Sequence, residues 1–290
     1  MIKIGKISDV SFWINKYGLG IKKILIIEVI IILLSLFFVE NSPSLLIINS
    51  LPILFFSFLL FQFGFFVSLE EFEVNKKKHR VVYFFLPNKM KKSYKAILYK
   101  GGFTSVSPYF DIKLMFLFPF MDIICAKTNI LNNALVLGGA GASVPIWLVN
   151  NFNVEKVVVV ENSERMIEIA KKYFVINSKS KIKFVHGDAI KYMNRNQGYD
   201  FIFLDIFWGN KVDKKIISPF FIRKIKKLSN KFLFINFGMM GDEKAHLLFK
   251  SYKKIIPDMK IFLIKSNFIG IWEKHPINVY DEIMDCTRLL

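Results

Sequence analysis

Short apolar segments that each end on a glycine or a carboxylate recur through the middle of the chain. Segments with the periodicity of helices separate them. The pattern therefore predicts parallel strands whose polar ends meet at one edge of a sheet. Such an edge is typical of a site for a nucleotide-like ligand. With the polar residues that follow them, these segments are 134–141, 157–161, 184–188 and 201–205.

The alternation of strand-like and helix-like segments continues to residue 256. We expect strands at 134–137, 157–161, 182–186, 200–205 and 231–237. Helices are expected at 143–151, 163–174, 188–195, 213–228 and 242–256. Two further strands, 259–265 and 268–274, are separated only by Ser266-Asn267 and predict an antiparallel hairpin. The fold class is therefore α/β, a Rossmann-like seven-stranded sheet of the class I methyltransferase type.

The N-terminal part predicts a membrane anchor. Hydrophobic residues make up 53% of the chain and its mean hydropathy is +0.38, which is high for a protein without a membrane segment. Residues 24–39 are apolar except for Glu28, and 45–69 carry no charge. We interpret 24–69 as a two-helix transmembrane hairpin after a basic cytoplasmic segment at 1–23. Lysines lie before the hairpin and after it, at 76–80, and basic flanks favour the cytoplasmic side of a membrane. We therefore expect a multi-pass protein of the cell membrane with a cytoplasmic catalytic domain.

Residues 70–130 predict a small β-sheet and a helix between this hairpin and the α/β domain at 131–290. Strand-forming residues at 81–86 and 94–99 bracket a polar loop, and 111–126 has the composition of an apolar helix. The only cysteines, Cys125 and Cys286, are far apart, so we predict no disulfide scaffold and no metal site.

The chain is strongly basic, with 41 Lys and Arg against 23 Asp and Glu and a formal charge of +18. Such a surface suits anionic lipid, nucleic acid or an acidic partner, or it reflects a lysine-rich composition. We expect membrane lipid as a partner and leave a homo-oligomer open. Nucleic acid is not expected, because no aromatic-interleaved motif accompanies the cations beside the predicted site, which are Lys211, Lys214, Lys215, Arg223, Lys224, Lys226 and Lys227.

The glycine loop and the first two carboxylates suit an adenosine. Gly138, Gly139 and Gly141 let the backbone turn sharply and approach a ligand at the start of a helix. Glu161 ends the next strand, where a carboxylate accepts both ribose hydroxyls, although an acid there also suits a helix N-terminus. Asp188 ends the third strand and either accepts the adenine amine or caps the following helix. Together they favour S-adenosylmethionine over NAD.

Asp205 ends the fourth of these strands, where the transferable group is expected. An acid here can orient or deprotonate an amine. Trp208 follows in a loop and either stacks on the substrate as part of a lid or packs as an ordinary hydrophobic residue.

Residues 133–237 resemble the spermidine synthase family, and especially its membrane-fused relatives. The likeness lies in Leu135-Val-Leu-Gly-Gly-Ala-Gly-Ala-Ser143, in 154–161 with 167–173, and in 187–188 with 199–205. The resemblance implies ribose binding by Glu161, adenine binding by Asp188 and catalysis by Asp205.

The chain departs from this family at positions that select its substrates. Gly141 stands where the family has an aspartate that holds the ammonium of decarboxylated S-adenosylmethionine, and Trp208 stands where a second aspartate grips the polyamine. The family's Gln and Tyr-His are not evident at 104–112. Without the acid in the loop, the carboxylate of ordinary S-adenosylmethionine is not repelled.

These departures favour one function and leave others open. We expect a membrane-anchored S-adenosylmethionine-dependent methyltransferase acting on a small-molecule amine. The first alternative is a polyamine aminopropyltransferase using decarboxylated S-adenosylmethionine. A non-catalytic nucleoside-binding membrane module is the other.

Overall fold

The computed structural model divides the chain into two compact units, Met1–Asp111 and Ile112–Leu290. The residues that it describes are 65–85, 93–99, 102–106, 131–139, 141–152, 154–175, 180–195, 197–206, 215–239, 243–264, 267–274 and 288–289.

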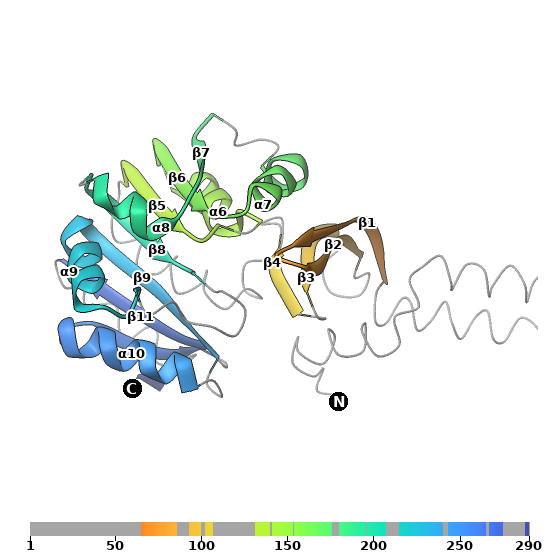
Figure 1. The fold of residues 1–290 in the computed structure, drawn as a ribbon. Helices are drawn as coiled ribbons and strands as arrows, with labels where there is room; N and C mark the ends of the chain where they lie inside the picture. The colour runs from red at the N-terminus through yellow and green to blue at the C-terminus, as the bar shows by residue number, and fades with distance from the viewer. Residues whose placement is uncertain are drawn as a thin grey trace, which may run out of the picture. The chain divides into compact units, whose positions relative to one another are not determined.

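The described part of the first unit is a four-stranded sheet with the order β1-β2-β3-β4 (Figure 1). Its strands are β1 (Phe65–Val74), β2 (Lys77–Phe85), β3 (Ser93–Tyr99) and β4 (Gly102–Val106). Each neighbouring pair is antiparallel. Asn75 and Lys76 connect β1 to β2 with φ of 50° and 61°, the left-handed conformation that a two-residue hairpin turn requires. The predicted pairing of 81–86 with 94–99 is thus confirmed as β2 with β3.

The predicted end of the transmembrane hairpin needs correction. Residues 65–69 belong to β1, whereas the sequence placed them in the second transmembrane helix. Phe and Val are favoured in strands as well as in membrane helices, so hydropathy alone did not distinguish the two. The lysines at 76–80 form the hairpin turn and the start of β2. The remainder of 24–69 and the predicted helix at 111–126 lie outside the described residues. Among the residues that the structure does describe, no helix is long and apolar enough to span a bilayer.

The second unit is built on an eight-stranded sheet with the order β12-β10-β11-β9-β8-β5-β6-β7 (Figure 1). Its central strands are β5 (Asn133–Leu137), β6 (Lys156–Glu161), β7 (Ile182–His186), β8 (Tyr199–Leu204) and β9 (Ser229–Met239), and these are parallel. The hairpin of β10 (Lys260–Ile264) and β11 (Asn267–Glu273) joins β9 through β11 in antiparallel fashion. The seven expected strands are confirmed, and the short β12 (Arg288–Leu289) adds an edge strand beside β10.

The helices lie where the sequence predicts them, with three corrections to their form. They are α6 (Ser143–Asn151), α7 (Glu164–Ile169), α8 (Ala189–Tyr192), α9 (Pro219–Leu228) and α10 (Glu243–Ile255). The helix expected at 163–174 changes to a π-helix at Ala170–Phe174, and the one expected at 188–195 ends in a 3₁₀ turn. Helix α9 begins at Pro219 and not at 213, because the Ser218 hydroxyl accepts from Phe221 N and Pro219 suits the first helical position.

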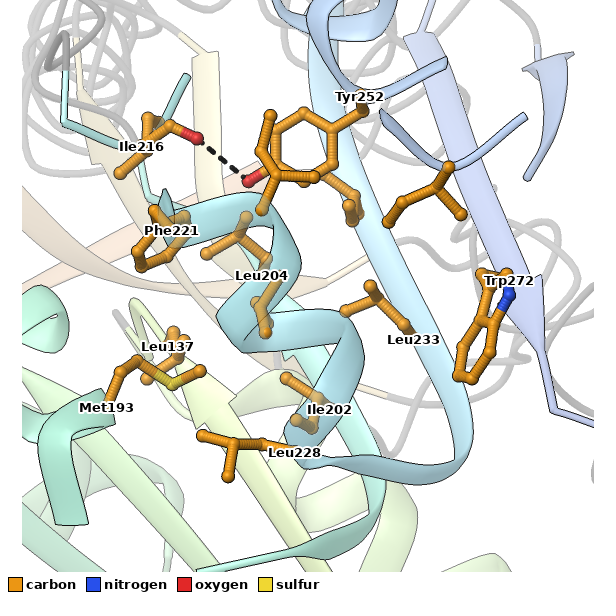
Figure 2. Packing of buried hydrophobic residues seen from close by; sticks show 14 of the residues in the cluster. Leu137, Met193, Ile202, Leu204, Ile216, Phe221, Leu228, Leu233, Tyr252 and Trp272 are labelled. Carbon is orange, nitrogen blue, oxygen red and sulfur yellow. Dashed lines mark hydrogen bonds between the residues drawn. The ribbon is translucent and has the colours of Figure 1, made fainter. Parts of the chain in front are cut away.

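The large sheet has an apolar core on the face that α8, α9 and α10 cover. Figure 2 shows Leu137 and Ile202 of the strands together with Leu228 of α9, with Trp272 of β11 at the border of the cluster. The Tyr252 hydroxyl of α10 donates to the carbonyl of Ile216 at 3.1 Å, so the one polar atom of this ring is satisfied. Alternate strand residues face the opposite side.

Candidate functional site

The predicted site residues lie at the carboxyl edge of the large sheet, where the strand order reverses. Strand β5 leads through α6 to β6 on one side, and its other neighbour, β8, leads through α9 to β9 on the other side. Right-handed crossovers in the two directions place these helices on opposite faces. In open α/β sheets, ligands bind in the crevice beyond the strand ends at such a switch point, which here is formed by β5 and β8. The carboxyl ends of β5, β6, β7 and β8 lie along this edge.

The glycine loop is held against its neighbours by backbone contacts. Gly138 N–H donates to the carbonyl of Val160 at 2.9 Å, and Asp205 N–H donates to the carbonyl of Leu137 at 2.9 Å. Gly138 has φ of 87°, and a Cβ there would lie 2.2 Å from the carbonyl oxygen of Asp205. A Cβ on Gly139 would lie 2.2 Å from Val159 Cγ1. Both glycines are therefore required by packing, whether or not a ligand is bound.

Glu161 lies beside this loop, as the sequence predicts. Its Oε2 accepts from Gly139 N–H at 3.1 Å and its Oε1 accepts from Ser163 N–H at 3.0 Å. These bonds fix the orientation of the carboxylate at the end of β6. A carboxylate offers about four lone-pair positions, so the hydroxyls of a ribose fit the donor and acceptor chemistry of this residue.

Asp188 acts as the N-cap of α8, the structural alternative that the sequence left open. Its Oδ1 accepts from Ile190 N–H at 2.7 Å and from Lys191 N–H at 3.0 Å. Gly187 N–H donates to the Glu161 carbonyl at 3.0 Å, which joins this cap to the end of β6. A Cβ on Gly187 would have no atom within 4 Å. The space beside Gly187 and the second oxygen of Asp188 fit an adenine, although the capping role alone explains the aspartate.

Asp205 is half-buried directly after β8, and its carboxyl group is unusually basic. Its pKa is raised from 3.8 to about 6, mainly by desolvation and in smaller part by the charge of Glu161, while a hydrogen bond from Asn236 acts in the opposite direction. Such a carboxylate is ionised at neutral pH and still accepts a proton readily. The structure therefore places the predicted catalytic residue near Glu161 and gives it a pKa suited to a general base.

Asn236 is a site residue that the sequence analysis missed. Its Nδ2 donates to Asp205 Oδ1 at 3.0 Å, and its Oδ1 accepts from Gly238 N–H at 3.1 Å. The two bonds orient the amide and, through it, the carboxylate. A polar residue near the end of the apolar strand predicted at 231–237 was the available signal, since that strand ends at the same edge of the sheet.

Two further predicted site residues are Gly141 and Trp208. Gly141 is buried just before α6, and no acid occurs in the first turn of that helix. Trp208 lies outside the described residues, in 207–214. Within the part of the chain that the structure describes, no group of His, Cys, Asp or Glu has the arrangement of a metal site.

The sequence of this region matches a known family. Residues 122–236 match the spermine/spermidine synthase domain. The chain is also 31% identical over 98 residues to the polyamine aminopropyltransferase of Vibrio vulnificus (strain CMCP6). That match covers 32% of this chain and about a third, 33%, of the length of the relative. The resemblance predicted from the sequence is confirmed for this part of the chain.

Solved structures show the same fold over a longer stretch. A probable spermidine synthase from Corynebacterium glutamicum ATCC 13032 has a TM-score of 0.61 at 11% identity, over 76% of this chain and 89% of the other. The spermidine synthase from Thermotoga maritima has a TM-score of 0.54 at 14% identity, over 74% and 75%. At such identities the likeness establishes the fold, a Rossmann-like sheet with a small N-terminal antiparallel sheet.

A graded loss of stability is expected when the three glycines of this edge are replaced by alanine. Gly138→Ala should cost about 3 kcal/mol or more, because a left-handed φ and a backbone clash coincide. Gly139→Ala should cost about 1–3 kcal/mol, since the Val159 side chain can move. Gly187→Ala, the matched control, should change stability by about 0.5 kcal/mol or less. Thermal unfolding of the full-length protein in a non-ionic detergent measures this order, and equal losses would contradict it.

Asp205→Asn is expected to stabilise the protein at neutral and alkaline pH. The folded pKa of about 6 exceeds the ordinary 3.8, so the folded state favours the protonated carboxyl and loses stability as pH rises through 6. At about 1.4 kcal/mol for each pH unit between the two values, the cost approaches about 3 kcal/mol above pH 7. The variant should melt higher than the parent at pH 8 and at the same temperature below about pH 4. A lower melting temperature at pH 8 would refute the desolvation argument.

Proposed function

We propose that the protein is a transferase that moves an alkyl group from an adenosyl sulfonium donor to an amine. The first candidate for that group is aminopropyl, because residues 122–236 match the spermine/spermidine synthase domain. The observation that carries this proposal is Asp205. It follows β8 at the crevice, near Glu161 and with a pKa raised to about 6. The matched family and the relative named above favour aminopropyl over methyl transfer.

The residues of this chain fit an adenosyl donor through their hydrogen-bonding chemistry. Glu161 would accept the ribose hydroxyls, and the second carboxylate oxygen of Asp188 would accept the adenine amine. The bound donor supplies an electrophilic carbon next to a positively charged sulfur. The carboxylates of Glu161 and Asp205 suit that charge electrostatically.

Asp205 would act on the incoming amine. Its carboxylate accepts the proton that the amine loses when its nitrogen forms the new bond to carbon. The bond from that carbon to sulfur breaks at the same time, and the adenosyl part of the donor leaves as a neutral thioether. Asn236 holds Asp205 Oδ1 by a hydrogen bond of 3.0 Å and thereby limits the rotation of the carboxylate. Orientation of the nucleophile contributes much of the rate in such displacements, because little covalent help is needed.

Methyl transfer from ordinary S-adenosylmethionine is the second candidate, favoured by the start of α6. Gly141 lies two residues before Ser143, the first residue of α6, and the first turn of α6 carries no acid. The partial positive charge of a helix N-terminus suits the carboxylate that only the ordinary donor carries. The two donors thus distinguish the two functions.

Membrane anchoring through 24–64 remains part of the proposal. The charge pattern of the sequence supports it, with the catalytic unit on the cytoplasmic side.

The choice of donor is the test of the proposed function. The full-length protein in a non-ionic detergent is incubated with putrescine and either decarboxylated or ordinary S-adenosylmethionine, and products are identified by mass spectrometry. We expect an aminopropylated product from the decarboxylated donor, with kcat reduced about 10²–10⁴-fold in Asp205→Asn. A methylated amine formed only from the ordinary donor would support the second candidate. No product and no binding of either donor would refute both.

The role of Asn236 is tested by the pH profile of this reaction. Its hydrogen bond favours the ionised form of Asp205, so Asn236→Ala should move the acidic limb of kcat/KM upward by about one pH unit from its position near 6. Asn230→Ala, on the same strand at the opposite edge, is the matched control and should leave the limb unchanged. A loss of rate without a displaced limb would assign Asn236 a merely structural role.

A further inference from the structure

A cavity lies at the opposite edge of the large sheet from Asp205. It has a volume of about 350 Å³ and is formed where α9 ends, β9 begins and β11 ends. Ser229, the first residue of β9, pairs with Tyr199, the first residue of β8. Asp205 follows the other end of β8, so the length of a strand separates this cavity from the proposed transferase site.

The wall of the cavity is strongly cationic. Arg223, Lys226 and Lys227 of α9 line it together with Lys274, which follows β11. Lys226 is neutralised in part by Asp258, whose Oδ1 lies 3.2 Å from the ammonium nitrogen. Among the described residues that line the cavity there is no carboxylate. The cations of α9 were predicted to lie beside the transferase site, but three of them, Arg223, Lys226 and Lys227, line this cavity at the far edge.

A buried hydroxyl adjoins these cations. Ser229 is 3% exposed and lines the cavity, and its Oγ has no hydrogen-bond partner among the described residues. A buried hydroxyl without a partner is energetically unfavourable, and natural structures seldom retain one without a reason. An acceptor atom in the adjoining cavity would satisfy it.

The remaining wall is apolar and rigid. Ile255 of α10 and Trp272 of β11 line the cavity. The Trp272 Nε1–H donates to Asp258 Oδ2 at 2.7 Å, and the Lys226 ammonium lies 5.0 Å from the centre of the indole ring. Burial raises the pKa of Asp258, but hydrogen bonds from Trp272 and Lys226 outweigh this effect and lower it. The carboxylate that holds the indole therefore remains ionised at neutral pH. The indole is therefore fixed before any ligand arrives.

We propose that this cavity binds a small phosphate ester. Its phosphate would accept from Ser229 Oγ and face Arg223, Lys227 and Lys274, while its organic part would contact Ile255 and Trp272. A phosphate carries between one and two negative charges and several acceptor oxygens, which matches cations that converge from separate elements. The volume lies at the lower end of the range of about 300–1,000 Å³ for small-molecule sites, so it admits more than a bare anion.

The ester is either a soluble metabolite or the headgroup of an anionic lipid, since both present the same phosphate chemistry. The test uses the full-length protein in a non-ionic detergent and measures binding by isothermal titration calorimetry. Glycerol 3-phosphate is the soluble probe, with glycerol as its uncharged control. Short-chain phosphatidic acid is the lipid probe, with short-chain phosphatidylcholine as its zwitterionic control.

We expect saturable binding of at least one phosphate probe and no binding of its control. Ser229→Ala should weaken that binding about tenfold, through loss of a charge-assisted hydrogen bond. It should not lower the melting temperature of the unliganded protein, because the hydroxyl that it removes has no partner. Lys227→Gln should weaken binding to a similar extent.

Lys156→Gln is the matched control, since it removes the same charge from an exposed position at the start of β6, away from the cavity. It should leave binding within about twofold of the parent. Saturable binding of glycerol 3-phosphate would identify a soluble ester, and binding of phosphatidic acid alone would identify a lipid headgroup. The proposal is overturned if neither probe binds, or if Lys156→Gln weakens binding as much as Lys227→Gln and Ser229→Ala do.

Discussion

The close approach of Gly138 to the backbone of Asp205 holds the carboxyl edge of the large sheet together. With no side chain at Gly138, the loop after β5 passes against the end of β8, and hydrogen bonds continue the connection to β6 and β7. The residues proposed to bind the donor and the residue proposed to act on the amine come from different strands. Their relative positions depend on this contact, because it brings the ends of those strands into one crevice.

The same edge gives its carboxylates separate properties. Backbone N–H groups satisfy both oxygens of Glu161, whereas Asp205 lies in a less solvated position with one bond from Asn236. These environments suit the two roles proposed here, ribose binding for Glu161 and proton acceptance for Asp205. The small antiparallel sheet of the first unit contributes none of these groups.

The sequence predicted much of the fold and most of this edge. Apolar strands that end on glycine or a carboxylate are visible in one dimension, and α6 occupies the predicted residues 143–151. Asn236 was missed because its contact with Asp205 depends on the register between β8 and β9. The cavity at Ser229 depends likewise on the pairing of β11 with β9, which brings Lys274 to the end of α9. Residues 65–69 were misassigned because strand and membrane-helix propensities overlap there.

The electrostatic repulsion between Glu161 and Asp205 has a consequence for ligand binding. It contributes to the raised pKa of Asp205, so near pH 6 a substantial fraction of that carboxyl group carries a proton. A cation that binds beside Asp205 favours the ionised form of its carboxyl group and lowers this pKa. Its binding is therefore coupled to proton release, and its affinity weakens as the solution becomes more acidic. A neutral ligand at the same edge would show neither effect, so the edge discriminates by charge before any chemical step takes place.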